Sequence, residues 1–116
     1  ERGFIVARED AVPFLEEKLA LLGLSDKEAA DFITYWAPRI RANEYTFVSF
    51  DASSYAQQVT YSFADEAGNQ VVPDTFIRVF MTIRPADADE TVTPQNFAPT
   101  PTRSGFTVVE WGGTEQ

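Results

Sequence analysis

The sequence contains no cysteine and no histidine among its 116 residues, and these two absences exclude much of protein chemistry. Without cysteine there is no disulfide, no thiolate nucleophile and no thiolate metal site. Without histidine the chain lacks the commonest general base and the commonest transition-metal ligand. We therefore predict no catalytic residue, no metal ligand and no cofactor, and we expect that the protein is not an enzyme.

Positive charge is also scarce. Nine lysines and arginines face eighteen aspartates and glutamates, which gives a formal net charge of -9. Such a surface repels phosphate backbones and anionic lipids, so we predict no nucleic-acid partner. The chain has no apolar run of about 18 residues, the length that a membrane-spanning helix needs, so we expect no membrane insertion of this domain.

Apolar and aromatic residues, by contrast, are plentiful. The sequence is 44% hydrophobic and holds ten Phe, four Tyr and two Trp. At 116 residues this composition supports a single α+β domain over 1–116, built on one hydrophobic core. Because the chain lacks an initiator Met and enters a strand-like run at once, we expect a domain excised from a longer protein.

The residues after that first run follow helical spacing. We predict a helix from Glu9 to Leu22, with Pro13 tolerated because it falls in the first turn. Gly23 supplies the left-handed residue that commonly ends a helix. The expected buried stripe of this helix is Phe14, Leu15, Leu19 and Leu22.

A capping box marks the start of a second helix. Ser25 is the expected N-cap, and Glu28, three residues later, reaches back to it. The helix runs to about Arg41, but Pro38 cannot donate to the carbonyl four residues earlier, which predicts a kink or an early end. Its expected inward face, with Trp36 in the core, is Ala29, Phe32, Ile33, Trp36, Ala37 and Ile40.

From residue 45 onward the pattern changes to strand. Together with the run at the start of the chain, the strand-like segments are 3–7, 45–50, 59–63, 75–83 and 105–111. Residues 64–70 form a polar turn, 85–104 a long Pro-rich acidic connection, and 112–116 a loose tail. The expected fold is a two-layer α+β sandwich, with an αα-hairpin packed on one face of a mainly antiparallel sheet of four or five strands.

The strand around residue 80 shows the clearest alternation. A period of two places on one face the aliphatic residues Ile77, Val79, Met81 and Ile83. The other face takes Phe76, Arg78, Phe80, Thr82 and Arg84. The helical hairpin covers the aliphatic face. The second face is then either crossed by the connection 85–104, with Phe97 as its anchor, or left open as a contact surface.

We take this second face as the candidate interaction site. Its predicted residues are Phe76, Arg78, Phe80, Arg84, Phe106 and Glu110. Arg78 is expected to pair with Glu110 if their strands are neighbours. The expected partners are the N-terminal region of the protein's own full-length chain or a second copy of the chain.

Three other groups have simpler explanations than a functional site. Asp87, Asp89 and Glu90 would suit calcium, but without an EF-hand spacing we expect solvated loop charges. A second polar group, explained by turn chemistry, consists of Asp65, Glu66, Asn69 and Asp74. Trp111 is expected to cap the core, with stacking against a ligand as the alternative.

Several segments also resemble a known family. They are Gly3–Val6 leading into Phe14–Leu19, Ala30–Pro38, Ile77–Met81 and Gly105–Gly113. Together they are similar to the C-terminal domain of an uncharacterised family of bacterial envelope proteins, many of them predicted lipoproteins. The resemblance implies export, an extracytoplasmic location attached to the cell envelope, and an additional, mostly β N-terminal region. It implies no activity.

These observations favour a non-catalytic binding or interaction module of an exported bacterial envelope protein. One alternative is a carboxylate-dependent hydrolase of a cell-wall polymer, since two acids held in a cleft can perform that chemistry. No motif among the eighteen acids selects such a pair. The other alternative is a structural spacer that buries its second face against the N-terminal region.

Overall fold

The computed structural model describes residues 2–56, 63–64, 70–71, 74–97, 100, 102–103 and 105–116. A 3-10 turn at Arg8–Asp10 leads into the first helix. In chain order the other elements are β1 (Phe4–Ala7), α1 (Ala11–Leu21), α2 (Asp26–Ile40), β2 (Tyr45–Ala56), β3 (Phe63–Ala64), β4 (Gln70–Val71), β5 (Thr75–Pro85) and β6 (Thr107–Glu115). The expected α+β class is confirmed. The predicted strand 59–63 lies, except for Phe63, outside the described residues.

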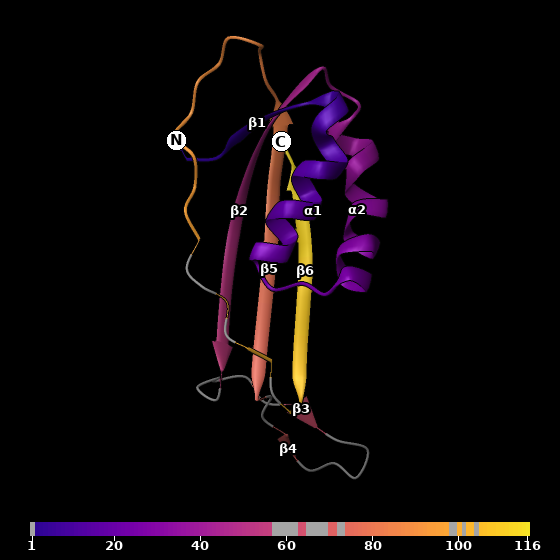
Figure 1. The fold of residues 1–116 in the computed structure, drawn as a ribbon, viewed down its shortest axis with the longest axis vertical. Helices are drawn as coiled ribbons and strands as arrows, with labels where there is room; N and C mark the ends of the chain where they lie inside the picture. Colours follow the sequence, from indigo (N-terminus) through magenta and orange to yellow (C-terminus); the bar gives the residue numbers. More distant parts are fainter. Residues whose placement is uncertain are drawn as a thin grey trace.

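Four strands form one mixed sheet in the order β1-β2-β5-β6. The β1–β2 and β2–β5 pairs are antiparallel, whereas β5 and β6 run parallel. β3 and β4 pair separately as a two-stranded sheet. Figure 1 shows both helices on one side of the four-stranded sheet. No helix within the described residues is long and apolar enough to cross a bilayer.

α1 ends as the sequence predicts. Gly23 has a φ of +97°, in the left-handed region, and the N–H of Leu24 returns to the Leu19 carbonyl at 3.0 Å. A side chain at Gly23 would also collide with the methyl of Thr100. Glycine is therefore required here twice, for its backbone conformation and for the close approach of the connection before β6.

The capping box of α2 is confirmed. The Glu28 N–H donates to Ser25 Oγ at 3.3 Å, and the Ser25 N–H donates to Glu28 Oε1 at 2.8 Å. The predicted end of this helix near Arg41 is confirmed, because α2 continues through Pro38 to Ile40, and the early end offered as one alternative does not occur. Buried packing outweighs the one backbone bond that proline removes, since Ile40 is fully buried and its carbonyl accepts from Thr46 Oγ1 at 3.0 Å.

The core lies between the helices and one face of the sheet. The predicted inward faces are confirmed: the aliphatic residues of β5 are at most 2% exposed, and Trp36 is 4% exposed. Trp111 also packs on this core, with its ring centroid 5.1 Å from that of Phe32. The buried helical side chains that face the sheet are Leu15, Leu19, Phe32, Trp36 and Ile40.

The end of the chain corrects a prediction. Residues 112–116 are not a loose tail: β6 continues to Glu115, and the Gln116 N–H donates to the Ile83 carbonyl at 2.8 Å. A Cβ on Gly113 would lie 2.7 Å from the Trp36 ring and 2.5 Å from the Met81 carbonyl. The glycine therefore makes room for the indole within the strand and does not end the strand.

The connection from β5 to β6 also differs from what the sequence predicted. Figure 1 shows residues 86–97 of this connection leaving the end of β5 and passing down beside β1 and β2. Phe97 packs against Phe4 and Phe50, at 6.3 and 5.9 Å between ring centroids, on the helical side of the sheet. The prediction that Phe97 anchors a cover over the opposite face is wrong.

Two polar anchors hold this connection. The carboxamide of Gln95 accepts from the Phe50 N–H at 2.8 Å and donates to the Phe50 carbonyl at 2.9 Å. Arg103 donates to both carboxylate oxygens of Glu28 and, at 2.8 Å, to the Gly23 carbonyl. Gln95 thus pairs with β2 beyond the last residue that β1 covers, and Arg103 ties the connection to the helices.

Candidate functional site

The outer face is the face of the sheet opposite the helices. Period-two alternation in β5 places Arg78, Phe80 and Arg84 on it, and each of these side chains is partly exposed. The neighbouring strands contribute Phe47 beside Arg84 and Glu110 beside Arg78. The structure therefore brings together four of the six residues predicted as an interaction face: Arg78, Phe80, Arg84 and Glu110.

Arg78 lies flat on an aromatic ring and next to an acid. Its guanidinium carbon is 4.5 Å from the centroid of Phe80, and its Nε is 3.6 Å from Glu110 Oε1. The conditional prediction of this pair is confirmed, because β5 and β6 are neighbours with Arg78 opposite Glu110. The two side chains are 42% and 53% exposed, so the ion pair adds at most about 1 kcal/mol to stability.

Arg84 repeats the arrangement at the other end of β5. Its guanidinium carbon is 4.4 Å from the centroid of Phe47, which is buried beneath it. Both carboxylate oxygens of Glu90 accept from Arg84, at 2.5 and 3.3 Å. Arg84 thereby lowers the pKa of the Glu90 carboxyl below its usual value. Each of the two arginines therefore covers a ring and pairs with an acid.

Glu90 consequently differs from the solvated charge that was expected. Besides Arg84, its carboxylate accepts from the Asp87 N–H at 3.4 Å, while Asp87 and Asp89 are exposed. In the part of the chain that the structure describes, no three acids, histidines or cysteines gather in a way that could hold a metal ion. Asp65, Glu66 and Asn69 lie outside that part.

Phe76 and Phe106 behave differently from the arginine-covered rings. Phe76 is only 1% exposed, so it is not available as an open contact residue, and that element of the predicted face is wrong. Phe106 is 42% exposed and immediately precedes β6. Its N–H donates to the Asp74 carboxylate at 2.9 Å, and its carbonyl accepts from the Asp74 N–H at 2.8 Å. These bonds fix the start of the parallel β5–β6 pair.

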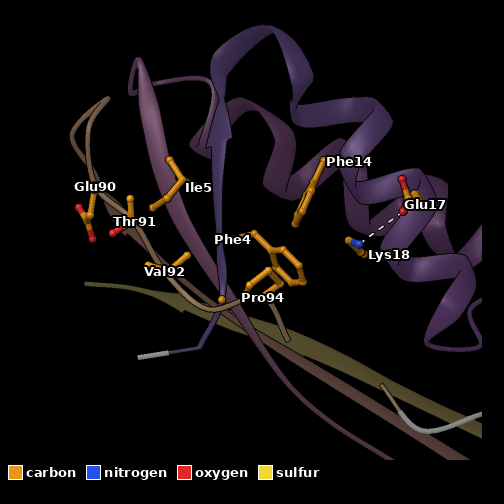
Figure 2. A pocket seen from close by; sticks show the side chains of 10 residues that line it. Phe4, Ile5, Phe14, Glu17, Lys18, Glu90, Thr91, Val92 and Pro94 are labelled. Carbon is orange, nitrogen blue, oxygen red and sulfur yellow. Dashed lines mark hydrogen bonds and ion pairs between the residues drawn. The ribbon is translucent and has the colours of Figure 1, made fainter. Parts of the chain in front are cut away.

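A second site was not predicted from the sequence. A hollow of about 440 Å³ lies between β1, α1 and residues 90–94, and we name it the edge pocket. Its apolar walls are Phe4, Phe14, Val92 and Pro94, and Lys18 is the cation that lines it. Figure 2 shows Phe14 and Lys18 reaching from α1 toward the ring of Phe4.

The Lys18 side chain is mostly buried and lies against two aromatic rings. Its ammonium lies 4.7 Å from the centroid of Phe4 and 5.9 Å from that of Phe14, and the side chain is only 18% exposed. Its acidic partner is Glu17 at 3.4 Å, which is itself 68% exposed. The sequence signal was the i,i+4 spacing of Phe14 and Lys18, but nothing local indicated residues 90–94 as the facing wall.

Comparison with protein families, with characterised proteins and with solved structures returns no match for this chain. The resemblance to envelope proteins therefore stays a prediction. Two of the segments that carry it meet in the core, where Gly113 of Gly105–Gly113 gives space to Trp36 of Ala30–Pro38. Packing alone is a sufficient physical reason for those residues.

Proposed function

We propose that this domain is a non-catalytic interaction module of an exported, envelope-attached bacterial protein, and that its outer face contacts a second copy of the chain. In this proposal the domain is a two-layer sandwich in which the two helices act as one αα-hairpin layer. The observation that carries the proposal is the one-sided helical layer. The face opposite to it presents Arg78 and Arg84 on aromatic rings, with Phe80 partly exposed.

Charge indicates through which surface two copies would meet. Two molecules that each carry a formal charge of -9 repel one another, so they associate most easily through the least acidic surface. On the outer face, Arg78 offsets Glu110 and Arg84 offsets Glu90, which among the described residues leaves the exposed Asp51 without a cation opposite it. Arginine and aromatic residues are also the types enriched in the centres of protein interfaces.

The size of the face predicts a weak contact. Nine residues of strand extend ~30 Å and three neighbouring strands span ~15 Å, so each copy offers on the order of 500 Å². Stable complexes usually bury about 800 Å² on each partner. We therefore expect a reversible dimer that forms only at high protein concentration, with a dissociation constant of about 10 μM or weaker.

Sedimentation equilibrium over a range of concentrations tests this proposal. Phe80→Ser removes the ring under Arg78 and should abolish the association. Tyr35→Ser is the matched control, because Tyr35 is also an exposed ring (49%) stacked with an arginine, Arg39 at 3.7 Å, but it lies on α2. This variant should associate like the wild type.

Three results would contradict the proposal. The first is a wild type that stays monomeric at about millimolar concentration, and the second is an association that Phe80→Ser leaves unchanged. The third is a loss of association in Tyr35→Ser equal to that in Phe80→Ser. Titration with the N-terminal region of the full-length protein tests the other expected partner. If that region binds the outer face and the domain does not self-associate, the face belongs to the protein's own chain and the second copy is excluded.

A further inference from the structure

The edge pocket is separate from the outer face and offers a different chemistry. Its volume of about 440 Å³ lies within the range of small-ligand sites, roughly 300–1,000 Å³. Phe4, Phe14, Val92 and Pro94 give it apolar walls suited to a single aromatic or branched aliphatic side chain. One part of a ligand for this pocket is therefore apolar.

The charges around the pocket favour an anionic group on that ligand. The Lys18 side chain is 18% exposed and its ammonium has three N–H donors, yet its acidic partner is Glu17, at 3.4 Å and largely exposed. Glu90 also lines the pocket, but its carboxylate is taken up by Arg84 and the Asp87 N–H, so it adds little negative potential. A carboxylate would complete the hydrogen bonding of Lys18 through charge-assisted bonds, which are stronger than neutral ones.

The edge of β1 supplies a third feature. The Gly3 N–H donates outward to the Thr93 carbonyl at 2.9 Å, whereas the Arg8 N–H donates toward β2, to Glu44. Backbone groups alternate along a strand, so the N–H and C=O of Ile5 point to the same edge as those of Gly3. Ile5 lines the pocket, and no backbone partner for it on that edge is found among the described residues.

We propose that the edge pocket binds the C-terminal residue of an extended peptide. The α-carboxylate pairs with Lys18, the last side chain packs against the apolar walls of the pocket, and the peptide backbone bonds to Ile5 as an added edge strand would. A fatty acid would satisfy the apolar wall and Lys18 but would leave the backbone of Ile5 unused. The peptide end is the ligand that meets all three features.

A pair of matched probes tests the proposal on the wild-type protein. N-acetyl-Gly-Phe with a free carboxylate should bind, with shifts of the Ile5 amide and the Lys18 side chain in NMR titration. The same peptide with a C-terminal amide should bind about tenfold more weakly, because it lacks the charge that Lys18 recognises. Sodium decanoate is the lipid-like probe. It should bind more weakly than N-acetyl-Gly-Phe and leave the Ile5 amide unshifted.

The sequence provides a matched pair of variants, since Lys18 and Lys27 are its two lysines. Lys18→Met keeps an unbranched apolar stem against the rings but removes the ammonium. It should weaken binding of the free acid about tenfold while leaving the amide probe unaffected. Lys27→Met removes the same charge from an exposed position and should bind as the wild type does. If Lys18→Met does not fold, the acid and amide probes on the wild type still test whether the pocket recognises a carboxylate.

Four results would overturn the proposal. Equal affinity for the acid and the amide would show that no carboxylate is recognised. An equal loss in Lys18→Met and Lys27→Met would show that only the overall charge matters. Tighter binding of decanoate than of the peptide would assign the pocket to a lipid. No shift at Ile5 up to about 5 mM free acid would show that the pocket is not a site, since small ligands of this size ordinarily bind at or below that concentration.

Discussion

The two faces of β5 are covered in different ways. Its inward residues Ile77, Val79, Met81 and Ile83 are at most 2% exposed and pack against side chains from α1 and α2. On the outer face, Phe80 and Phe47 of the neighbouring strand are covered by the guanidinium groups of Arg78 and Arg84. The inward face of β5 is covered by the helical layer, whereas the rings on the outer face are covered by arginine side chains of β5 itself.

The comparison shows that direction and coverage are separate properties of a strand residue. Alternation in the sequence fixes which face a side chain joins, and both sets were assigned correctly. It does not fix what lies over that face. Phe76 demonstrates this, because it points to the outer face and is nevertheless 1% exposed.

The largest expected effect separates two phenylalanines of the outer face. Phe76→Ala should lower the free energy of unfolding by about 3–5 kcal/mol, since it leaves a cavity at a buried site. Phe80→Ala should cost about 1–2 kcal/mol, because the ring is partly exposed and its main contact is Arg78. Urea denaturation of both variants measures the difference. Equal losses would mean that Phe80 is as deeply covered as Phe76.

Two adjacent glycines of β6 compare the faces directly. Gly113→Ala should cost about 1–3 kcal/mol, because its Cβ points at the helical side and meets both the Trp36 ring and the Met81 carbonyl. Gly112→Ala meets the Phe80 ring at 3.0 Å on the outer face, where that ring can shift. Its cost should be near zero, offset by the lower entropy of the unfolded chain. Thermal melts of the two variants, run together, test this order.

The helical layer can be weakened without touching either face. Ser25→Ala removes the acceptor for the Glu28 N–H and should cost about 1 kcal/mol, the usual loss for an N-cap. Ser25→Thr retains a hydroxyl acceptor and should recover most of this loss. An unchanged denaturation midpoint in Ser25→Ala would show that tertiary packing alone positions the start of α2.

The smallest expected effect is a pH dependence on the helical side. The hydrogen bond from Arg103 lowers the pKa of the Glu28 carboxyl below its usual value. Because the folded-state pKa is depressed, the stability that this pair contributes is present above the unfolded pKa and is lost as pH falls through the folded pKa. Glu28→Gln can still accept from the Ser25 N–H but carries no charge, so it should be less stable than the wild type near neutral pH. The two midpoints should converge in acid, and a constant difference would exclude this ion pair as the cause.

Local chemistry made much of the fold predictable. The end of α1 and the start of α2 followed from Ser25, Glu28 and Gly23, whose side chains or backbone act within a few residues of their position. The inward stripes followed from spacing. These features depend on contacts short in sequence, so a single chain reveals them.

Contacts distant in sequence account for what was missed. Pro38 and Gly113 both suggested an end to regular structure, yet burial of Ile40 and the fit of Gly113 against Trp36 continue the helix and the strand. The candidate sites divide in the same way. The sequence identified Arg78, Phe80, Arg84 and Glu110, because period two and one strand pairing are enough to gather them.

The sequence by itself determined the α+β class, the helix caps, the two faces of β5 and an acidic chain without cysteine or histidine chemistry. Only the tertiary structure decided the mixed strand order, the burial of Phe76 and the edge pocket. The physical reason is the distance along the chain. Lys18 and Val92 share a pocket although 74 residues separate them, and packing of the whole chain, not any local preference, brings them together.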